Sequence, residues 1–313
     1  MKLRTIATNG IRMRFAEEGA GPLVLLLHGF PESWYSWRHQ LPALAAAGYH
    51  AVAPDQRGYG GTDAPAAIEA YDILHLTADA VGLLDALGEK QAVVVGHDWG
   101  SPVAWHCALL HPERFRAVAA LSVPYTGRAP MPPLELFRAL AGDRFFYVLY
   151  FQEPGVAERE LEQDVRDTMS RFLYAASGDV TEDPNFWEKP GDAKFLDGLP
   201  SPMALPSWLT AADLDYFASE FRRTGFRGGL NWYRNFDRNW ELTVELADAK
   251  VTQPALFVAG ERDGVLRMIP VEAMRDWVPN LRELRLLPGC GHWTQQEKPA
   301  EVNAALIEFL KRL

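Results

Sequence analysis

The feature that most constrains the fold of this chain is an alternation of short apolar runs with segments of helical spacing. The runs are PLVLLLHG, HAVAPD, QAVVVG and RAVAALSV in the first half, and PALFVAG and LRELRLLPG near the end. Continuous apolar runs are typical of strands that are covered on both faces. Strands separated by helices form βαβ crossovers, which place them in a parallel sheet. The pattern therefore predicts an α/β fold.

The first residues of the chain have a different pattern. Polar and apolar residues alternate over 2–8 and 11–17, and Asn9-Gly10 between them is a strong signal for a tight hairpin. With this hairpin, we expect a mostly parallel eight-stranded sheet flanked by helices. The helical patterns cover 34–46, 73–87, 101–110 and 301–313.

The alternation stops near Pro124 and resumes around Gln253. The proline-rich stretch PYTGRAPMPPLE begins the interruption, and a mostly helical, aromatic-rich region follows it to about Trp240. We therefore expect an α/β core formed by residues 1–124 and 241–313. Residues 125–240 are predicted to form an inserted, mainly helical cap domain.

Composition excludes several classes of partner. The formal net charge of −10 argues against nucleic acid, because phosphate binding requires a basic surface. The chain lacks the ~18 consecutive uncharged apolar residues of a membrane span, so we expect no membrane partner. The N-terminus lacks a secretory pattern, and Cys107 and Cys290 have no metal-ligand spacing. These features predict a cytoplasmic protein without a metal site.

Asp98 is the candidate nucleophile. It lies in GHDWGS, between a predicted strand and a predicted helix, in the small-x-nucleophile-x-small pattern of a nucleophile elbow. Such a turn strains the backbone and brings strand and helix so close that Gly96 and Gly100 have no room for side chains. The helix N-terminus would stabilise negative charge there. The alternative is that Asp98 only caps the following helix.

An aspartate in place of a serine changes the chemistry of the elbow. A serine that attacked a saturated carbon would form an ether, which water does not readily cleave. Asp98 would form an alkyl ester instead, whose carbonyl belongs to the protein and is open to attack by water. The residue type therefore predicts substitution at an sp³ carbon, with an epoxide or an alkyl halide as the electrophile.

Attack by water on such an ester requires a general base that functions near neutral pH. His292, in a glycine-flanked loop after the last predicted strand, is the best-placed histidine. Asp263 follows the preceding strand and would orient the imidazole, with Glu261 as the rival acid. The backbone N–H groups of Phe30, in HGFP, and of Trp99 would form the oxyanion hole.

Two other histidines flank these motifs. His97 precedes the nucleophile, but consecutive side chains diverge, so we expect it to pack or to form hydrogen bonds. His28 is expected to brace the loop that carries Phe30.

Six motifs together resemble one known family. They are HGFPESWYSWRHQ, DQRGYGGTDAP, GHDWGSPVAW, YFQEPGVAE, GFRGGLNWYRN and CGHWTQQEKP. Over essentially the whole chain, the sequence resembles the α/β-hydrolase-fold epoxide hydrolases, especially the soluble type. The resemblance implies conversion of small hydrophobic epoxides to vicinal diols, with Asp98 as nucleophile, His292 as base and Asp263 as its partner. It implies no metal or organic cofactor, a monomer or homodimer, and a detoxifying role.

The family also has two lid tyrosines that hydrogen-bond to the epoxide oxygen. By motif they fall on Tyr147 and Tyr233, and Tyr150, one helical turn further, is a rival for the first position. A phenol has a pKa of about 10, so it stays protonated at neutral pH and can donate to the oxygen as the ring opens. The alternative is that these tyrosines are lid core.

The substrate site would then be lined by both tyrosines together with Phe30 and Trp99. The resemblance also implies that the peptide bond between Phe30 and Pro31 is cis, as it often is in the family.

Two related readings stay open. Haloalkane dehalogenases also have a tryptophan where Trp99 stands, together with an Asn after HG or a second tryptophan in the lid. Phe30 removes the Asn option, whereas Trp187 and Trp208 keep the lid option open. Fluoroacetate dehalogenases usually have Arg at the Trp99 position. A ligand-sensing relative that binds without turnover is the remaining alternative.

Overall fold

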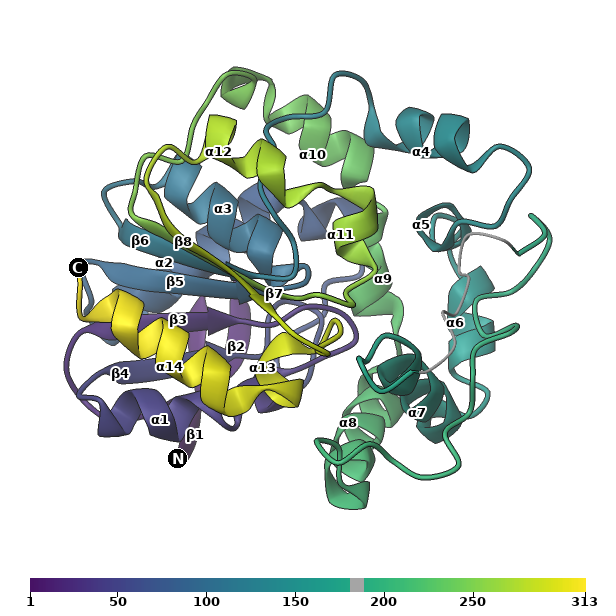
Figure 1. Ribbon diagram of the computed structural model, residues 1–313, viewed down its shortest axis with the longest axis horizontal. Coiled ribbons are helices and arrows are strands. Elements are labelled where there is room, and N and C mark those ends of the chain that lie inside the picture. The colour runs from purple at the N-terminus through teal and green to yellow at the C-terminus, as the bar shows by residue number, and fades with distance from the viewer. Residues whose placement is uncertain (181–188) are drawn as a thin grey trace.

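A computed structural model describes residues 1–180 and 189–313 of the chain. The described residues contain an eight-stranded sheet in the order β1-β2-β4-β3-β5-β6-β7-β8, shown in Figure 1. The pairs β1–β2 and β2–β4 are antiparallel and all other neighbours are parallel, which confirms the predicted fold class. The strands are β1 (Lys2–Thr8), β2 (Ile11–Glu18), β3 (Leu23–Leu27), β4 (His50–Pro54), β5 (Ala92–His97), β6 (Phe115–Leu121), β7 (Ala255–Gly260) and β8 (Leu281–Leu287).

The predicted hairpin joins β1 to β2. Thr8 pairs with Ile11, so the turn has two residues, and Asn9 and Gly10 have φ angles of 43° and 76°. Both angles lie in the left-handed region, where Asn and Gly are the most favoured residues. The turn chemistry read from the sequence is therefore the one that sets this register.

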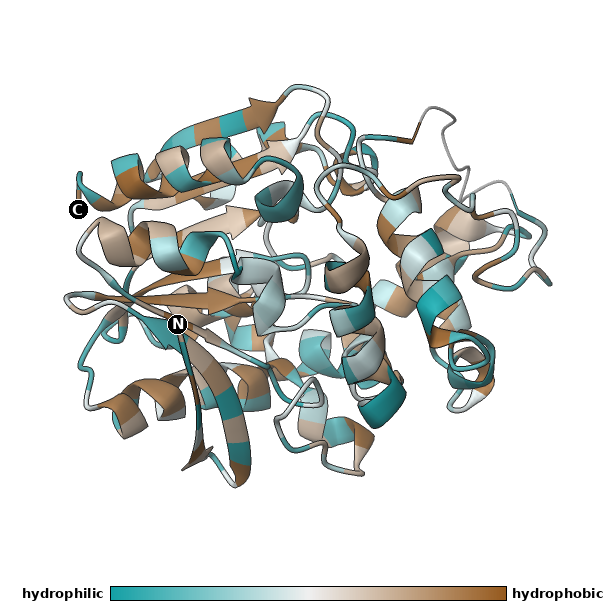
Figure 2. Ribbon diagram, turned by 90° about the horizontal axis from the view of Figure 1, so that it is seen from below, coloured by the Kyte–Doolittle hydropathy of each residue, from teal (hydrophilic) through white to brown (hydrophobic). Residues whose placement is uncertain are grey.

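Helices cover both faces of the sheet. Leu41 and Leu44 of α1 and Leu306 of α14 belong to the hydrophobic cluster on one face, whereas α2 and α3 pack into the larger cluster on the other. In Figure 2 the central strands are mostly hydrophobic, whereas the edge strands and the helices are striped with hydrophilic residues. The core helices are α1 (Gln40–Ala46), α2 (Ile73–Leu87), α3 (Gly100–Leu110), α11 (Val265–Met268), α12 (Met274–Trp277), α13 (Thr294–Glu297) and α14 (Pro299–Leu310), with short 3₁₀ turns η1 (Trp34–Trp37), η2 (Ile68–Tyr71) and η4 (Val271–Ala273).

The helix predicted over 34–46 is divided into η1 and α1. Pro42 cannot donate to the carbonyl of Arg38, so α1 has to begin just before the proline. The final helix begins at Pro299 rather than at residue 301, because proline is well suited to the first turn of a helix.

The chain between β6 and β7 forms helices beside the carboxyl ends of the strands (Figure 1). Helix α9 contacts η2, and α10 contacts α2, so this part of the cap rests directly on the core. The helices are α4 (Pro133–Ala141), α5 (Tyr147–Tyr150), α6 (Val156–Leu161), α7 (Val165–Ala175), α8 (Ala211–Thr224), α9 (Arg227–Tyr233) and α10 (Phe236–Leu242), followed by η3 (Val244–Leu246). Among the described residues, none of these helices has the length and apolar character needed to cross a membrane.

Candidate active site

Asp98 lies on a strained turn between β5 and α3, with a φ angle of 50°. Its neighbours two positions away are sterically restricted to glycine. A Cβ on Gly96 would collide with the backbone of Gly100, and one on Gly100 would lie 2.6 Å from the carbonyl carbon of Leu27. A Cβ on Gly29 would collide with the side chain of Asp98 itself. The close approach expected of a nucleophile elbow is therefore present.

The Asp98 carboxylate has a different partner for each oxygen. Oδ1 accepts a hydrogen bond of 2.7 Å from the backbone N–H of Phe30, and Oδ2 lies 3.3 Å from Nε2 of His292. The side chain remains 14% exposed. No side chain caps α3, so the structure contradicts the reading of Asp98 as a helix cap.

His292 lies between two carboxylates. Its Nδ1 is 3.1 Å from both oxygens of Asp263, and the backbone N–H of Val265 donates to Asp263 at 2.9 Å. Glu261, the rival acid, is exposed. Burial opposes the charged ring, but Asp263 and Asp98 outweigh it, and the pKa of His292 lies well above its ordinary value.

The pKa of Asp263 is shifted in the opposite direction from that of His292. Burial alone would raise the pKa of Asp263, but the charge and hydrogen bond of His292 outweigh burial and lower it. The two groups therefore form an ion pair, in which Asp263 fixes the ring so that its other nitrogen faces Asp98.

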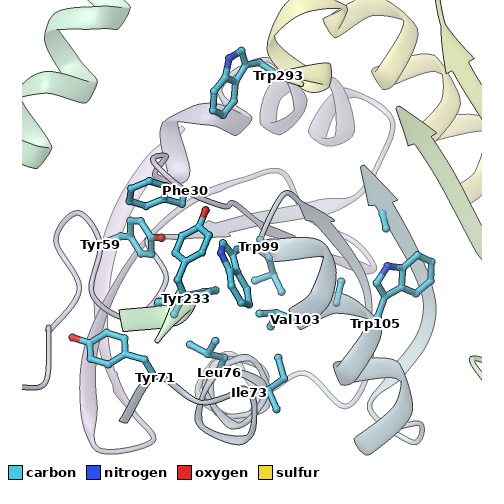
Figure 3. Close-up of a cluster of buried hydrophobic side chains, with 14 of the residues drawn as sticks. Phe30, Tyr59, Tyr71, Ile73, Leu76, Trp99, Val103, Trp105, Tyr233 and Trp293 are labelled. Atoms are coloured by element: carbon cyan, nitrogen blue, oxygen red, sulfur yellow. The ribbon is translucent and has the colours of Figure 1, made fainter. Parts of the chain in front are cut away.

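Two tyrosines of the cap lie above this pair. The ring of Tyr233 is 5.5 Å from that of Phe30, 5.2 Å from that of Trp99 and 6.0 Å from that of Tyr147. Figure 3 shows Phe30, Tyr233 and Trp99 in one row. Burial raises the pKa of both tyrosines, and the charge of Asp98 raises it further, so both phenols stay protonated.

The structure separates Tyr147 from its rival. The hydroxyl of Tyr150 donates to Glu160 of α6 at 2.7 Å, so it is already engaged by a carboxylate of the cap. The peptide bond between Phe30 and Pro31 is cis, in agreement with the expectation from the resemblance.

A second carboxylate–imidazole pair, which the sequence analysis missed, lies behind the first. Glu32 and His97 are fully buried, and Nδ1 of His97 is 2.7 Å from Glu32. The other ring nitrogen is 2.7 Å from the backbone oxygen of His292. Burial would raise the pKa of Glu32, but His97 and the N–H of Gly29 outweigh it and lower the pKa to about 2. Both ring nitrogens of His97 therefore face an acceptor oxygen, one of a carboxylate and one of the backbone.

His28 differs from His97, because one of its ring nitrogens accepts a hydrogen bond. Its Nε2 accepts a hydrogen bond from the N–H of Gln56 at 3.0 Å, its Nδ1 faces the oxygen of Gly29, and burial lowers its pKa. It is a neutral ring that links two loops, whereas the sequence predicted only that it braces the loop of Phe30. The signal for the Glu32 pair was a carboxylate between the aromatic residues of the stretch FPESW.

The tryptophans of the dehalogenase alternative give it no support. The indole N–H of Trp208 donates to Asp179 at 3.0 Å at the surface, and Trp187 lies outside the described residues. Among the described residues, no group of His, Cys, Asp or Glu is arranged to hold a metal ion.

Comparison with known proteins identifies the family. The chain matches the α/β hydrolase fold family over residues 22–299. It is 53% identical, over 99% of its length, to epoxide hydrolase A of Mycobacterium tuberculosis, of which it covers 97%. It is 44% identical to bifunctional epoxide hydrolase 2 of Sus scrofa over 96% of its own length, and covers 54% of that longer protein.

A solved structure gives the same result. The crystal structure of epoxide hydrolase A from Mycobacterium thermoresistibile has a TM-score of 0.96 at 56% identity, covering 99% of this chain and 98% of that one. The chain therefore belongs to the α/β-hydrolase-fold family and, within it, to the epoxide hydrolases. The family predicted from the motifs is confirmed, and neither the dehalogenase nor the ligand-sensing alternative is supported.

Proposed function

We propose that this epoxide hydrolase forms vicinal diols through a covalent ester on Asp98, with His292 as base and Asp263 as its partner. The observation that carries the proposal is the division of the Asp98 carboxylate between two partners. Oδ1 is held by the N–H of Phe30, and Oδ2 faces the imidazole of His292. One oxygen is thus positioned to remain the ester carbonyl, and the other to form the new bond.

In the first step, Oδ2 of Asp98 attacks the less hindered carbon of the epoxide. A carbon–oxygen bond forms as the ring carbon–oxygen bond breaks, and the ring oxygen leaves as an alkoxide. Tyr147 and Tyr233 donate to that oxygen as its charge develops, and one of them supplies the proton. Their raised pKa supports this role, because a phenol that ionised readily would not arrive with its proton.

In the second step, water attacks the carbonyl carbon of the ester. His292 takes the proton of that water, and the N–H groups of Phe30 and Trp99 stabilise the oxyanion. The tetrahedral intermediate then breaks its bond to the alkyl oxygen, which takes the proton from His292 and leaves as the diol. Asp98 keeps the oxygen that came from water.

The change of charge on Asp98 supports the timing of the two steps. In the free enzyme two carboxylates raise the pKa of His292, which favours the charged ring. Esterification removes the negative charge of Asp98, so the ring is then stabilised by Asp263 alone and gives up its proton more easily. His292 thus becomes a base only after the ester has formed.

A single turnover in ¹⁸O-labelled water tests this mechanism. We expect the label in the side chain of Asp98, found by mass spectrometry of its peptide, and an unlabelled diol. Label in the diol with none in the peptide would show direct attack by water on the epoxide and would refute the covalent route. Asp98→Ala should have no turnover and should form no ester.

Several coarser expectations complete the proposal. We propose that the substrates are small hydrophobic epoxides, that the enzyme is a cytoplasmic monomer or homodimer with a detoxifying role, and that it needs no cofactor. The aromatic surroundings of the tyrosines support an apolar substrate. We also propose residues 1–124 and 241–313 as the core and 125–240 as the cap. All strands of the described sheet lie outside the proposed cap, although α10 continues to Leu242.

A further inference from the structure

Helix α9, which ends at Tyr233, makes direct backbone contact with a loop of the core. A Cβ on Gly228 would collide with the carbonyl of Gly58 and would lie 2.7 Å from its Cα. In the reverse direction, a Cβ on Gly58 would lie 2.9 Å from the Cα of Gly228. Gly58 has a φ angle of 88°, so it is restricted to glycine by conformation as well. The two backbones touch because neither residue has a side chain.

The next residue of α9, Gly229, contacts the oxyanion loop. A Cβ on Gly229 would lie 2.6 Å from the ring of Phe30 and 2.7 Å from the hydroxyl of Tyr59. Phe30 is also the residue whose N–H holds the Asp98 carboxylate. One face of α9 is therefore seated on the same loop that positions the nucleophile, as the close packing of Phe30, Tyr59 and Tyr233 in Figure 3 illustrates.

A buried hydrogen bond fixes the end of the helix. The indole N–H of Trp232 donates to the backbone oxygen of Arg57 at 3.1 Å, and Trp232 is 1% exposed. Arg57 is itself held by a buried two-point ion pair with Asp79 on α2, with contacts of 2.7 and 2.5 Å. The acceptor of the indole is thus part of the rigid core.

The other tyrosine, Tyr147, belongs to a different helix of the cap. Tyr147 is the first residue of α5, a helix of four residues, and its ring contacts Phe146, Phe151 and Phe195 of the cap. Tyr233 is attached to the core, whereas Tyr147 is packed among cap residues.

We propose that Gly58, Gly228 and Trp232 are positioning residues for Tyr233, and that they fix its hydroxyl relative to Asp98. This inference rests on the proposed role of Tyr233 in opening the epoxide. The three residues do not touch the reacting atoms. They set the distance between nucleophile and proton donor through the core, in addition to the contacts that Tyr233 makes with Phe151 and Gln152 of the cap.

The test uses Trp232→Phe and Gly228→Ala in rapid-quench single turnovers, with the ester on Asp98 followed by intact mass. Trp232→Phe removes the indole N–H and keeps an aromatic ring. We expect alkylation about threefold to tenfold slower, as for the loss of one hydrogen bond. Gly228→Ala displaces α9 and should slow alkylation by about tenfold to a hundredfold. Hydrolysis of the ester should stay at the wild-type rate in both.

Trp208→Phe is the matched control, because it removes an indole N–H that donates to Asp179 at the surface of the cap. It should alkylate at the wild-type rate. If Gly228→Ala fails to fold, as judged by circular dichroism, Trp232→Phe still decides the question.

A double mutant separates positioning from general damage to the fold. In a Tyr233→Phe background, Trp232→Phe should slow alkylation less than twofold further, because the hydroxyl that it positions is absent. The inference is overturned if Trp232→Phe alkylates at the wild-type rate, slows both steps equally, or costs the same with and without the Tyr233 hydroxyl. Failure of the proposed function looks different, since the wild-type enzyme would then form no ester at all.

Discussion

Two buried carboxylate–imidazole pairs lie next to each other in this enzyme, Asp263 with His292 and Glu32 with His97. The two imidazole rings are 5.0 Å apart, and in each ring both nitrogens face an oxygen. The pairs differ in what lies on the far side of the ring. His292 faces Asp98, whose charge disappears in the proposed reaction, whereas His97 faces the backbone oxygen of the His292 residue.

Because of this difference, His292 can act as a base, whereas His97 acts as a structural brace. A ring whose second acceptor changes charge can release its proton during the reaction. The acceptors of His97 are the carboxylate of Glu32 and a backbone carbonyl, and neither changes its charge in the proposed reaction. The network also holds three parts of the site together, because Glu32 accepts from Gly29 and from Gln295 while His97 is adjacent to Asp98. We interpret the second pair as a charged clamp between the oxyanion loop, the elbow and the base loop.

The largest effect is expected from the loss of the proposed base. His292→Ala should still form the ester on Asp98, because the nucleophile keeps its contact with Phe30. Hydrolysis should be slower by about 10³-fold or more, since no other group accepts the proton of the attacking water. Intact-mass spectrometry after mixing with styrene oxide should show the protein with one substrate mass added. An unmodified protein that still turns over would mean that another group, such as His97, is the base.

Loss of the His97 side chain should affect the stability of the fold more than the rate of the reaction. His97→Ala leaves the charge of Glu32 buried without its partner, which typically costs about 3–5 kcal/mol of unfolding free energy. Urea denaturation measures this loss. The matched control is His106→Ala on α3. Within the described residues its ring is hydrogen-bonded to the backbone oxygen of Pro102 and to no carboxylate, and burial lowers its pKa, so it is neutral. Equal losses in the two variants would contradict a charged clamp at His97.

Glu32→Gln tests the same clamp through pH. The pKa of Glu32 is about 2 in the folded protein against an ordinary value of 4.5. A lowered pKa means that the stabilisation is fully present above about pH 4.5 and is lost as the pH falls toward 2. The shift corresponds to about 3 kcal/mol. The unfolding free energy of the wild type at pH 7 should therefore exceed that of Glu32→Gln by roughly that amount. The difference in unfolding free energy should shrink between pH 4.5 and 3, and a difference that is independent of pH would refute the assignment.

The sequence could predict the first pair and the nucleophile, since each of the three residues belongs to a local pattern. The glycines around Asp98, the loop after β8 and the end of β7 each identify one residue, and the fold brings the carboxyl ends of parallel strands to one edge. The choice of Asp263 over Glu261 also has a local cause. Asp263 is buried beside His292, and Glu261 is exposed.

The second pair could not be predicted in this way. Glu32 and His97 are 65 residues apart, and the second contact of His97 is with a backbone oxygen, which carries no sequence signal. The contact of Gly228 with Gly58 is similar, because it depends on how close two backbones come. Tyr147 and Tyr150 are one helical turn apart, and only the fold shows that the hydroxyl of Tyr150 is bonded to Glu160.

The smallest effect is expected at Ser122, which completes the clamp from the end of β6. Its hydroxyl donates to the oxygen of His292 at 2.9 Å, the same oxygen that His97 contacts. Ser122→Ala should cost about 1 kcal/mol in urea denaturation, because that oxygen keeps its bonds from His97 and from the N–H of Thr294.

Ser122→Gly sharpens this prediction. Ser122 has a φ angle of 72°, where a side chain is strained by about 1 kcal/mol and glycine is not. The glycine variant loses the same hydrogen bond but is relieved of the strain, so it should be at least as stable as the alanine variant. Both should keep turnover within about threefold of wild type, because the contact from His97 still holds the base loop. A glycine variant clearly less stable than Ser122→Ala would mean that the side chain is needed for packing and that the clamp ends at His97.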